Sequence, residues 1–285
     1  MGRGRKAEMQ AVILAAGRGK RLHPLTVTRT KAMIPVLGVP IVERVMEPLF
    51  ANGITDFILV VSPKDEEIRR YFREESQLAA DIHLVPQPQP LGMGHALRQA
   101  APFIEGDFLL SACDNLVPEA DVTKLLQRWG ESPRLNALLT LLRVNPEDIP
   151  RVGIVDLEGK KVTKIIEKPS LAEAPSNIAS TPLYCFSHQF LDYLPRIPLS
   201  PRGEYELQKA IQMLIMEEGN VCGFFIERRI DLTKPDDLLE ITKHFLRNGY
   251  AQVTPQAEKI DQRTRILPPV YFEKGVKIGK NCVIG

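Results

Sequence analysis

Five short apolar runs, separated by amphipathic stretches, constrain the fold of this chain more than any other feature. The runs are residues 11–16, 56–61, 82–85, 107–113 and 136–142. They are almost continuous in apolar residues, as strands of a parallel sheet are when helices cover both faces. Between them apolar residues recur at helical spacing, for example from Ile41 and from Val122 onward. The pattern predicts an α/β protein with a mixed, mainly parallel sheet flanked by helices.

The pattern changes after about residue 150. Three strand-like runs then follow in quick succession, at residues 152–156, 161–166 and 178–186, and turns containing Pro and Ser separate them. These runs predict a second, smaller sheet element. Helical patterns follow at about residues 204–217 and 235–247.

The end of the chain carries a six-residue repeat. Ile278-Gly279 recurs as Ile284-Gly285, a spacing typical of a left-handed β-helix. We therefore divide the chain into an N-terminal extension (1–8), a main domain (9–250), and a linker with the first rungs of a truncated left-handed β-helix (251–285). Because an uncapped rung exposes unpaired strand groups, we expect the natural protein to continue into a longer β-helix.

Charge and cysteine content narrow the functional class. The chain has 37 Lys and Arg against 35 Asp and Glu, so no global basic field favours a nucleic-acid partner. The four cysteines are far apart, which is typical of reduced thiols in the cytoplasm. The basic N-terminus lacks the apolar core of a signal peptide. We expect a cytoplasmic protein with no nucleic-acid and no membrane partner.

A glycine-rich loop follows the first strand, over residues 15–31. It holds five cations but lacks the third glycine of a dinucleotide site and the Lys-Ser/Thr ending of a P-loop. The cations are Arg18, Lys20, Arg21, Arg29 and Lys31. No acidic residue occurs between Glu8 and Glu43. The loop therefore predicts a polyphosphate ligand and argues against a Rossmann dehydrogenase.

Several motifs, in order along the chain, resemble those of the sugar-1-phosphate nucleotidyltransferases. They are AVILAAGRGKRL from residue 11, QPQPLGMGHAL from Gln87, Asp114-Asn115, Glu167-Lys168-Pro169, RGEYEL from Arg202, and Asp231. The resemblance covers nearly residues 10–240 and is closest to the thymidylyl- and uridylyltransferases. It implies the Rossmann-like nucleotidyltransferase fold and the joining of a pyrimidine nucleoside triphosphate, UTP or dTTP, to a sugar-1-phosphate. The sugar would be glucose-1-phosphate or N-acetylglucosamine-1-phosphate, and pyrophosphate would be released.

The same resemblance implies roles for individual residues. Arg21, Lys31 and Lys168 match the catalytic cations that bring two repelling phosphates together. Nucleotide-binding positions are Ala16, Gly17, Gly19, Gln87 and Gly92, with the Gln87 amide reading the pyrimidine edge. Sugar-binding positions are Asn115, Gly153, Glu167, Asn177 and Tyr184. Asp114 and Asp231 match two ligands of Mg²⁺, an ion that proteins often hold with one or two carboxylates and substrate phosphates.

Departures from the family pattern leave the sugar open. Cys113 and Pro182 stand where the family has glycine, and both affect the shape of the expected pocket. The alternatives are a mannose-1-phosphate guanylyltransferase, against which Gln87 argues, and a catalytically silent regulatory subunit, against which the complete set of charged residues argues. The resemblance also implies that a trimer forms only in a longer natural chain.

Overall fold

The computed structural model describes residues 9–250, 260–273 and 275–285. The predicted extension over residues 1–8 and the linker residues 251–259 therefore lie outside the described residues. Within the described residues, no helix is long and apolar enough to span a membrane.

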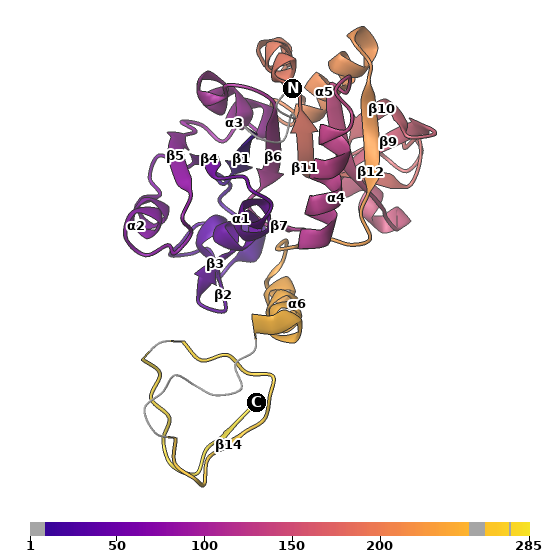
Figure 1. The fold of residues 1–285 in the computed structure, drawn as a ribbon. Coiled ribbons are helices and arrows are strands. Elements are labelled where there is room, and N and C mark those ends of the chain that lie inside the picture. The colour runs from indigo at the N-terminus through magenta and orange to yellow at the C-terminus, as the bar shows by residue number, and fades with distance from the viewer. Residues whose placement is uncertain (1–8, 251–259, 274) are drawn as a thin grey trace.

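A nine-stranded sheet runs through the centre of the molecule (Figure 1) in the order β5-β4-β1-β6-β11-β8-β12-β10-β9. Its strands are β1 (Gln10–Leu14), β4 (Asp56–Val61), β5 (Asp81–Pro86), β6 (Phe108–Ala112), β8 (Ala137–Arg143), β9 (Gly153–Glu158), β10 (Lys161–Glu167), β11 (Ile178–Phe186) and β12 (Val221–Phe225). All five apolar runs that predict strands form strands of this sheet.

The sheet is mixed, and the expectation of a mainly parallel sheet holds for its first four strands but not for most pairings of the other five. Strands β5, β4, β1 and β6 pair in parallel, and so do β8 and β12. Strand β11 is antiparallel to β6, β8 and β9, and β10 is antiparallel to β9 and β12. The three later runs thus join the main sheet, and the prediction of a second sheet element was wrong. A short turn joins β9 to β10, too short for the crossover that parallel strands require.

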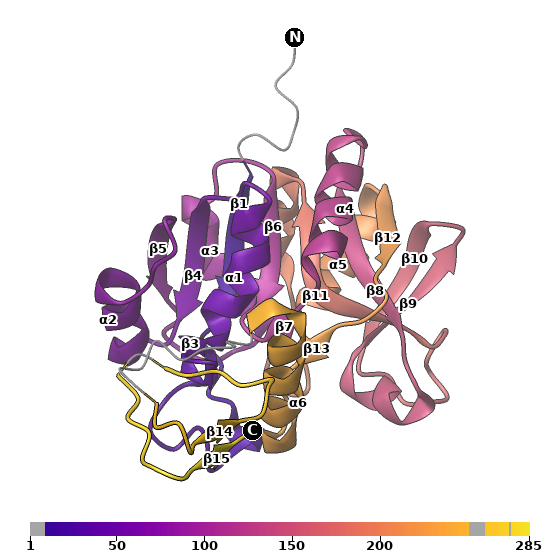
Figure 2. The same cartoon turned by 60° about the horizontal axis from the view of Figure 1, so that its bottom comes forward.

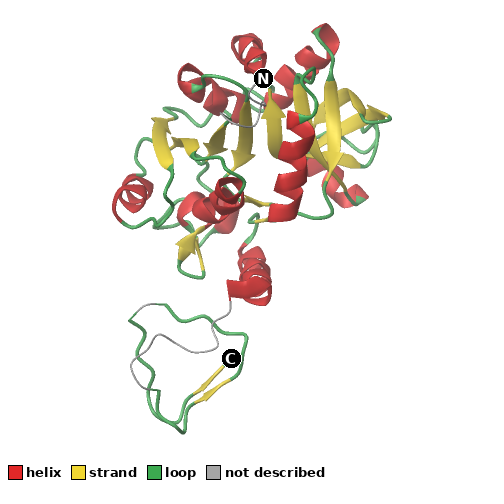
Figure 3. Cartoon of the chain, in the orientation of Figure 1, coloured by secondary structure: helices red, strands yellow, loops and turns green. Residues whose placement is uncertain are grey.

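Helices cover both faces of the sheet (Figures 2 and 3). The apolar side chains of α1 (Ile41–Ala51), α2 (Glu66–Glu74) and α4 (Glu119–Gly130) share one buried cluster with Ala11 and Ile13. Those of α3 (Met93–Ala100) and α5 (Leu207–Glu217) share another with Val12 and Leu14. Alternate residues of β1 therefore face opposite layers. This explains why the strand is apolar from Ala11 to Leu14.

Three small elements complete the main domain. Strands β2 (Pro35–Val36) and β3 (Val39–Pro40) form a hairpin before α1. Strand β7 (Asn115–Leu116) pairs antiparallel with β13 (Ile230–Asp231). Helix α6 (Pro235–Phe245) follows directly and confirms the predicted helix there.

The C-terminal segment contains one short parallel strand pair. Strand β14 (Arg265–Ile266) pairs with β15 (Val283–Ile284), so Arg265 stands beside Val283, 18 residues later. The segment lies beneath the β2–β3 hairpin in Figure 1. Tyr271 and Phe272 line a cavity together with Gly38 of the hairpin turn. Residues 260–273 and 275–285 hold no stack of coils, so the β-helix stays a prediction.

Candidate active site

A cavity of about 610 Å³ lies beyond the carboxyl end of β6, where β9, β10 and β11 meet. Half of its lining residues are charged. Among its lining residues are nine of the residues predicted from sequence: Arg21, Lys31, Asp114, Asn115, Gly153, Glu167, Lys168, Tyr184 and Asp231. Residues separated by more than 200 positions in the chain therefore share one cavity.

The glycine-rich loop contributes Arg21 and Lys31 to the lining of the cavity. Gly19 has φ of +65°, and a Cβ there would lie 3.0 Å from Lys31 Cβ and 3.1 Å from Thr26 Cγ2. A side chain at this position would thus both strain the backbone and displace Lys31. Ala16, Gly17 and Gly19 precede the 3-10 helix Lys20–Leu22 and are not among the residues that line the cavity; Arg21 in that helix is.

Lys31 forms an ion pair with Asp114, and both side chains are mostly buried. Two contacts fix the backbone next to Lys31. The Thr30 hydroxyl donates to Asp65 Oδ2 at 2.7 Å, and Asp65 Oδ1 caps α2 by accepting from the Ile68 amide. Thr30, the residue before Lys31, is therefore held against the N-terminus of α2.

The β7–β13 pair brings the two predicted metal ligands together. In its ladder Asp231 stands opposite Asn115, the residue after Asp114. Asp231 Oδ2 accepts from the Thr233 hydroxyl at 2.9 Å and lies 3.6 Å from an Arg229 nitrogen. Among the described residues no cluster of three or more His, Cys, Asp or Glu could hold a metal ion. Two carboxylates alone suit a hard cation whose other ligands come from substrate oxygens and water.

The side-chain oxygen of Asn115 is suited to accept a hydrogen bond from a ligand. Its Nδ2 donates to the Pro182 carbonyl at 3.3 Å. Its Oδ1 is buried and has no hydrogen-bond partner among the described residues. An unpaired buried acceptor costs free energy, so a bound donor at this position would be favoured.

The opposite wall of the cavity is built on three adjacent strands. Glu167 of β10 and Ser180 of β11 both stand beside Gly153 of β9. Glu167 Oε2 is buried without a partner in the described part of the chain. Burial raises the pKa of Glu167, and the neighbouring Lys168 ammonium opposes this shift. Lys168 Nζ lies 3.4 Å from Glu167 Oε1.

Tyr184 is fully buried, and its hydroxyl donates to Ser180 Oγ at 3.1 Å. Asn177, the remaining sugar-site prediction, is exposed and is not among the residues that line the cavity. The sequence reasoning missed Ser180 and Arg229, which do line it. Arg229 stands two residues before Asp231, on the same side of an extended segment, and that spacing was the available signal.

Gln87 and Gly92 are brought together at the carboxyl end of β5, outside the lining of this cavity. The Gln87 amide is buried, and its Nε2 donates to the Gly92 carbonyl at 3.2 Å. Gly92 has φ of +91°, and a Cβ there would lie 2.9 Å from Glu204 Cβ. The RGEYEL segment therefore packs directly on this loop.

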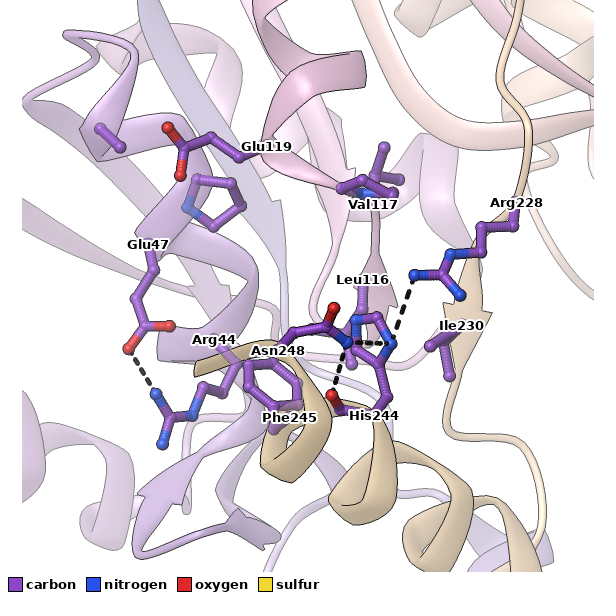
Figure 4. A pocket seen from close by; sticks show the side chains of 13 residues that line it. Arg44, Glu47, Leu116, Val117, Glu119, Arg228, Ile230, His244, Phe245 and Asn248 are labelled. Atoms are coloured by element: carbon purple, nitrogen blue, oxygen red, sulfur yellow. Dashed lines mark hydrogen bonds and ion pairs between the residues drawn. The ribbon is translucent and has the colours of Figure 1, made fainter. Parts of the chain in front are cut away.

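A second cavity, of about 470 Å³, lies behind the β7–β13 pair (Figure 4). Leu116 and Ile230 line it from the strands, and His244 and Phe245 line it from α6. Since side chains alternate along a strand, Asn115 and Asp231 face the first cavity, whereas Leu116 and Ile230 face the second.

The model of the nucleotidyl transferase family matches residues 10–248. The chain belongs to this family. Bifunctional protein GlmU of Methanococcus maripaludis S2 is 33% identical over 275 residues, which is 96% of this chain. The chain spans 62% of the length of that relative.

Two further relatives carry single activities in their names. UTP–glucose-1-phosphate uridylyltransferase AglF of Haloferax volcanii is 33% identical, over 80% of this chain and 93% of its own length. Glucose-1-phosphate thymidylyltransferase of Streptomyces griseus is 31% identical, over 97% of this chain and 76% of its own.

A solved UDP-glucose pyrophosphorylase in complex with UDP-glucose shares the fold. Its TM-score is 0.76 at 18% identity, over 85% of this chain and 99% of that one. The mixed α/β nucleotidyltransferase fold expected from the motifs is thereby confirmed.

Proposed function

We propose that this chain transfers a nucleotidyl group from UTP or dTTP to glucose-1-phosphate or N-acetylglucosamine-1-phosphate and releases pyrophosphate. The family supports the reaction class, and the uridylyl- and thymidylyltransferase relatives support pyrimidine nucleotides. The observation that carries the proposal is the meeting of Lys31, Lys168, Asp114 and Asp231 in one cavity. Two ammonium groups and two carboxylates suit two phosphate groups and one cation.

In this proposal a phosphate oxygen of the sugar-1-phosphate attacks the α-phosphorus in line. The new P–O bond forms as the bond from the α-phosphorus to the bridging oxygen breaks, and the electron pair leaves with pyrophosphate. The attacking oxygen is already ionised, so no general base is required. Catalysis then consists of positioning and charge neutralisation.

Each cation has a place in this step. Arg21 steadies the triphosphate from the glycine-rich loop, with the backbone of Ala16, Gly17 and Gly19 beside it. Lys168 holds the sugar phosphate. Lys31 is paired with Asp114 in the structure. In the reaction its ammonium group contacts the phosphates of both substrates.

The proposed cofactor is Mg²⁺, held by Asp114 and Asp231 together with phosphate oxygens. When bound it neutralises charge that develops on the triphosphate. The unpartnered Asn115 Oδ1 beside these carboxylates is suited to a substrate hydroxyl.

On the sugar side we propose Gly153, Glu167 and Tyr184, the last acting through Ser180. The unpaired Glu167 Oε2 is an acceptor for sugar hydroxyls. On the base side we propose Gln87 and the Gly92 backbone. A sugar-binding role for Asn177 also stays a proposal, and Asn177 is not among the residues that line this cavity.

The C-terminal segment is proposed to be the first coil of a left-handed β-helix. The family match ends at residue 248, and β14 and β15 stand 18 residues apart, the length of three six-residue repeats. Trimer formation through such a helix belongs to the same proposal.

A matrix of substrates tests the proposed function. UTP, dTTP, CTP, ATP and GTP are each mixed with glucose-1-phosphate, N-acetylglucosamine-1-phosphate or mannose-1-phosphate in magnesium, and pyrophosphate release is measured. We expect the fastest release with UTP or dTTP and one of the first two sugars. A purine nucleotide as the best substrate would overturn the base assignment. No release with any pair would overturn the activity.

A further inference from the structure

The Gln87 carboxamide, whose contact with the base rests on the proposed function, is held in one orientation by two protein acceptors. Its Nε2 lies 3.2 Å from the Gly92 carbonyl oxygen and 3.1 Å from His95 Nδ1. A carbonyl oxygen only accepts, so the atom facing Gly92 must be the amide nitrogen. Both N–H bonds of the amide then point at protein atoms. The amide presents only its oxygen, Oε1, to a ligand.

We propose that His95 is a positioning residue that sets base specificity, because its Nδ1 accepts from Gln87 and so leaves only an acceptor facing the base. Uracil and thymine carry an N–H at N3 and pair with Oε1. Cytosine carries a lone pair at N3, which Oε1 repels. His95 thereby admits UTP and dTTP and excludes CTP, without touching the nucleotide itself.

The imidazole cannot withdraw from Gln87. Its ring stacks on Tyr205, with centroids 6.1 Å apart and planes at 26°. The Gly94 amide donates to the Tyr205 carbonyl at 2.9 Å, and the Tyr205 amide donates to the Leu91 carbonyl at 2.8 Å. A Cβ on Gly94 would lie 2.6 Å from Ile197 Cδ1. The first turn of α3 is thus wedged against the RGEYEL segment, and His95 is fixed with it.

Electrostatics favours the neutral ring that this role requires. Burial lowers the pKa of His95, and the Arg98 guanidinium lowers it further, while the Gln89 carbonyl acts in the opposite sense. A neutral imidazole has one acceptor nitrogen, and a protonated ring has none. The other ring nitrogen, Nε2, lies 3.4 Å from the Gln99 amide nitrogen, which also donates to the His95 carbonyl at 3.3 Å. When Nδ1 accepts from Gln87, Nε2 carries the ring proton.

The test compares His95→Phe, which keeps a flat ring without nitrogen, with His95→Asn, whose Oδ1 stands near the position of Nδ1. We measure kcat/KM for UTP and for CTP at saturating sugar-1-phosphate. In His95→Phe one N–H of the Gln87 amide loses its acceptor and the Gly92 carbonyl alone holds the amide. The ratio of UTP to CTP should therefore fall roughly 5- to 100-fold, as for an unpaired buried polar group. His95→Asn should restore most of the ratio. The control is His83→Phe, an exposed histidine on β5, which should leave the ratio unchanged.

A Gln87→Ala background separates positioning from packing. If His95 acts through Gln87, His95→Phe has no further effect on the ratio once the amide is absent. An equal further loss in that background, or an unchanged ratio in His95→Phe, would overturn the inference while leaving the proposed function intact. A wild-type chain without pyrimidine preference would overturn both.

A measurement on the wild-type chain needs no variant. The ¹⁵N chemical shifts of the His95 ring at pH 7.5 report which nitrogen carries the proton. We expect an unprotonated Nδ1 whose shift moves when Gln87 is replaced by Ala. A protonated Nδ1 would overturn the inference whatever the variants do.

Discussion

Glu167 stands directly opposite Gly153 in the β9–β10 ladder, with its Oε2 buried against a glycine that leaves no room for a side chain. A Cβ on Gly153 would lie 3.1 Å from Glu167 Oε2 and 3.0 Å from Ser180 Oγ. The cavity wall thus holds a buried carboxylate oxygen that has no hydrogen-bond partner in the described part of the chain. A natural protein retains such an arrangement at a cost in stability when a ligand uses it.

The first prediction concerns the pH dependence of stability. Burial raises the folded-state pKa of Glu167 above its usual value of 4.5. The unfolded chain therefore loses this proton at lower pH than the folded chain. The free energy of unfolding should fall as pH rises from about 4.5 through the raised pKa.

Chemical denaturation from pH 4 to pH 8 measures this dependence. Glu167→Gln should remove it and be relatively more stable than wild type at pH 8, while losing sugar-phosphate affinity. Glu173→Gln is the matched control, because a hydrogen bond from Ser170 lowers the pKa of that exposed carboxyl. Any effect of Glu173 has the opposite sign and is weak in solvent. The same pH slope in wild type and Glu167→Gln would contradict the prediction.

The second prediction concerns Gly153→Ala. The added methyl must displace Glu167 Oε2 or Ser180 Oγ. We expect KM for the sugar-1-phosphate to rise at least about tenfold, the lower part of the range for a group misplaced in a binding site. The KM for the nucleotide should stay within about twofold of wild type. Gly130→Ala is the control, since a Cβ there meets no atom within 4 Å. A nucleotide KM that rises in parallel would indicate general damage to the cavity.

The third prediction separates two neighbouring polar residues. Ser180 lies in the cavity and accepts from the Tyr184 hydroxyl, whereas Asn177 is exposed. Ser180→Ala should weaken sugar-1-phosphate binding by about 1 kcal/mol. Asn177→Ala should change it by less than about 0.5 kcal/mol. Calorimetric titration of both variants decides between them, and a larger effect of Asn177→Ala would restore its role as predicted from sequence.

The position of each residue in the fold explains whether its role in the site could be predicted from the sequence. Asp114 and Glu167 were assigned by their resemblance to family motifs, and for Asp114 the position after an apolar strand agreed with ligand binding at the carboxyl edge of an α/β sheet. Ser180 was missed because it lies inside a strand, where only pairing with Gly153 turns it toward the cavity. The antiparallel half of the sheet was missed for a related reason. An apolar run shows burial on two faces, but the direction of its partners depends on connections elsewhere in the chain.

Long-range charge pairing also had no local signal. Lys31 and Asp114 are 83 residues apart in sequence, and their ion pair exists because β1 and β6 are neighbours in the sheet. The family motifs could assign Lys31 and Asp114 to one site. That they contact each other could come only from the structure.

The last prediction concerns this ion pair and the proposed metal. Asp114→Ala should lower kcat in magnesium about 100-fold or more, since removing one preorganised charge from a transition state commonly costs that much. Lys31 then loses its partner and is free to hold a phosphate. The KM for the nucleotide should therefore rise far less than kcat falls.

Asp231→Asn should be milder, because a neutral amide oxygen still ligates a hard cation. Its thermal unfolding should match that of wild type, since the Thr233 hydroxyl can donate to the amide oxygen as it does to Asp231. Pyrophosphate release over a range of magnesium concentrations measures both variants. If both kept wild-type kcat and the wild-type magnesium dependence, the two carboxylates would be structural. Magnesium dependence shifted to higher concentration in Asp231→Asn would place the ion between the two residues.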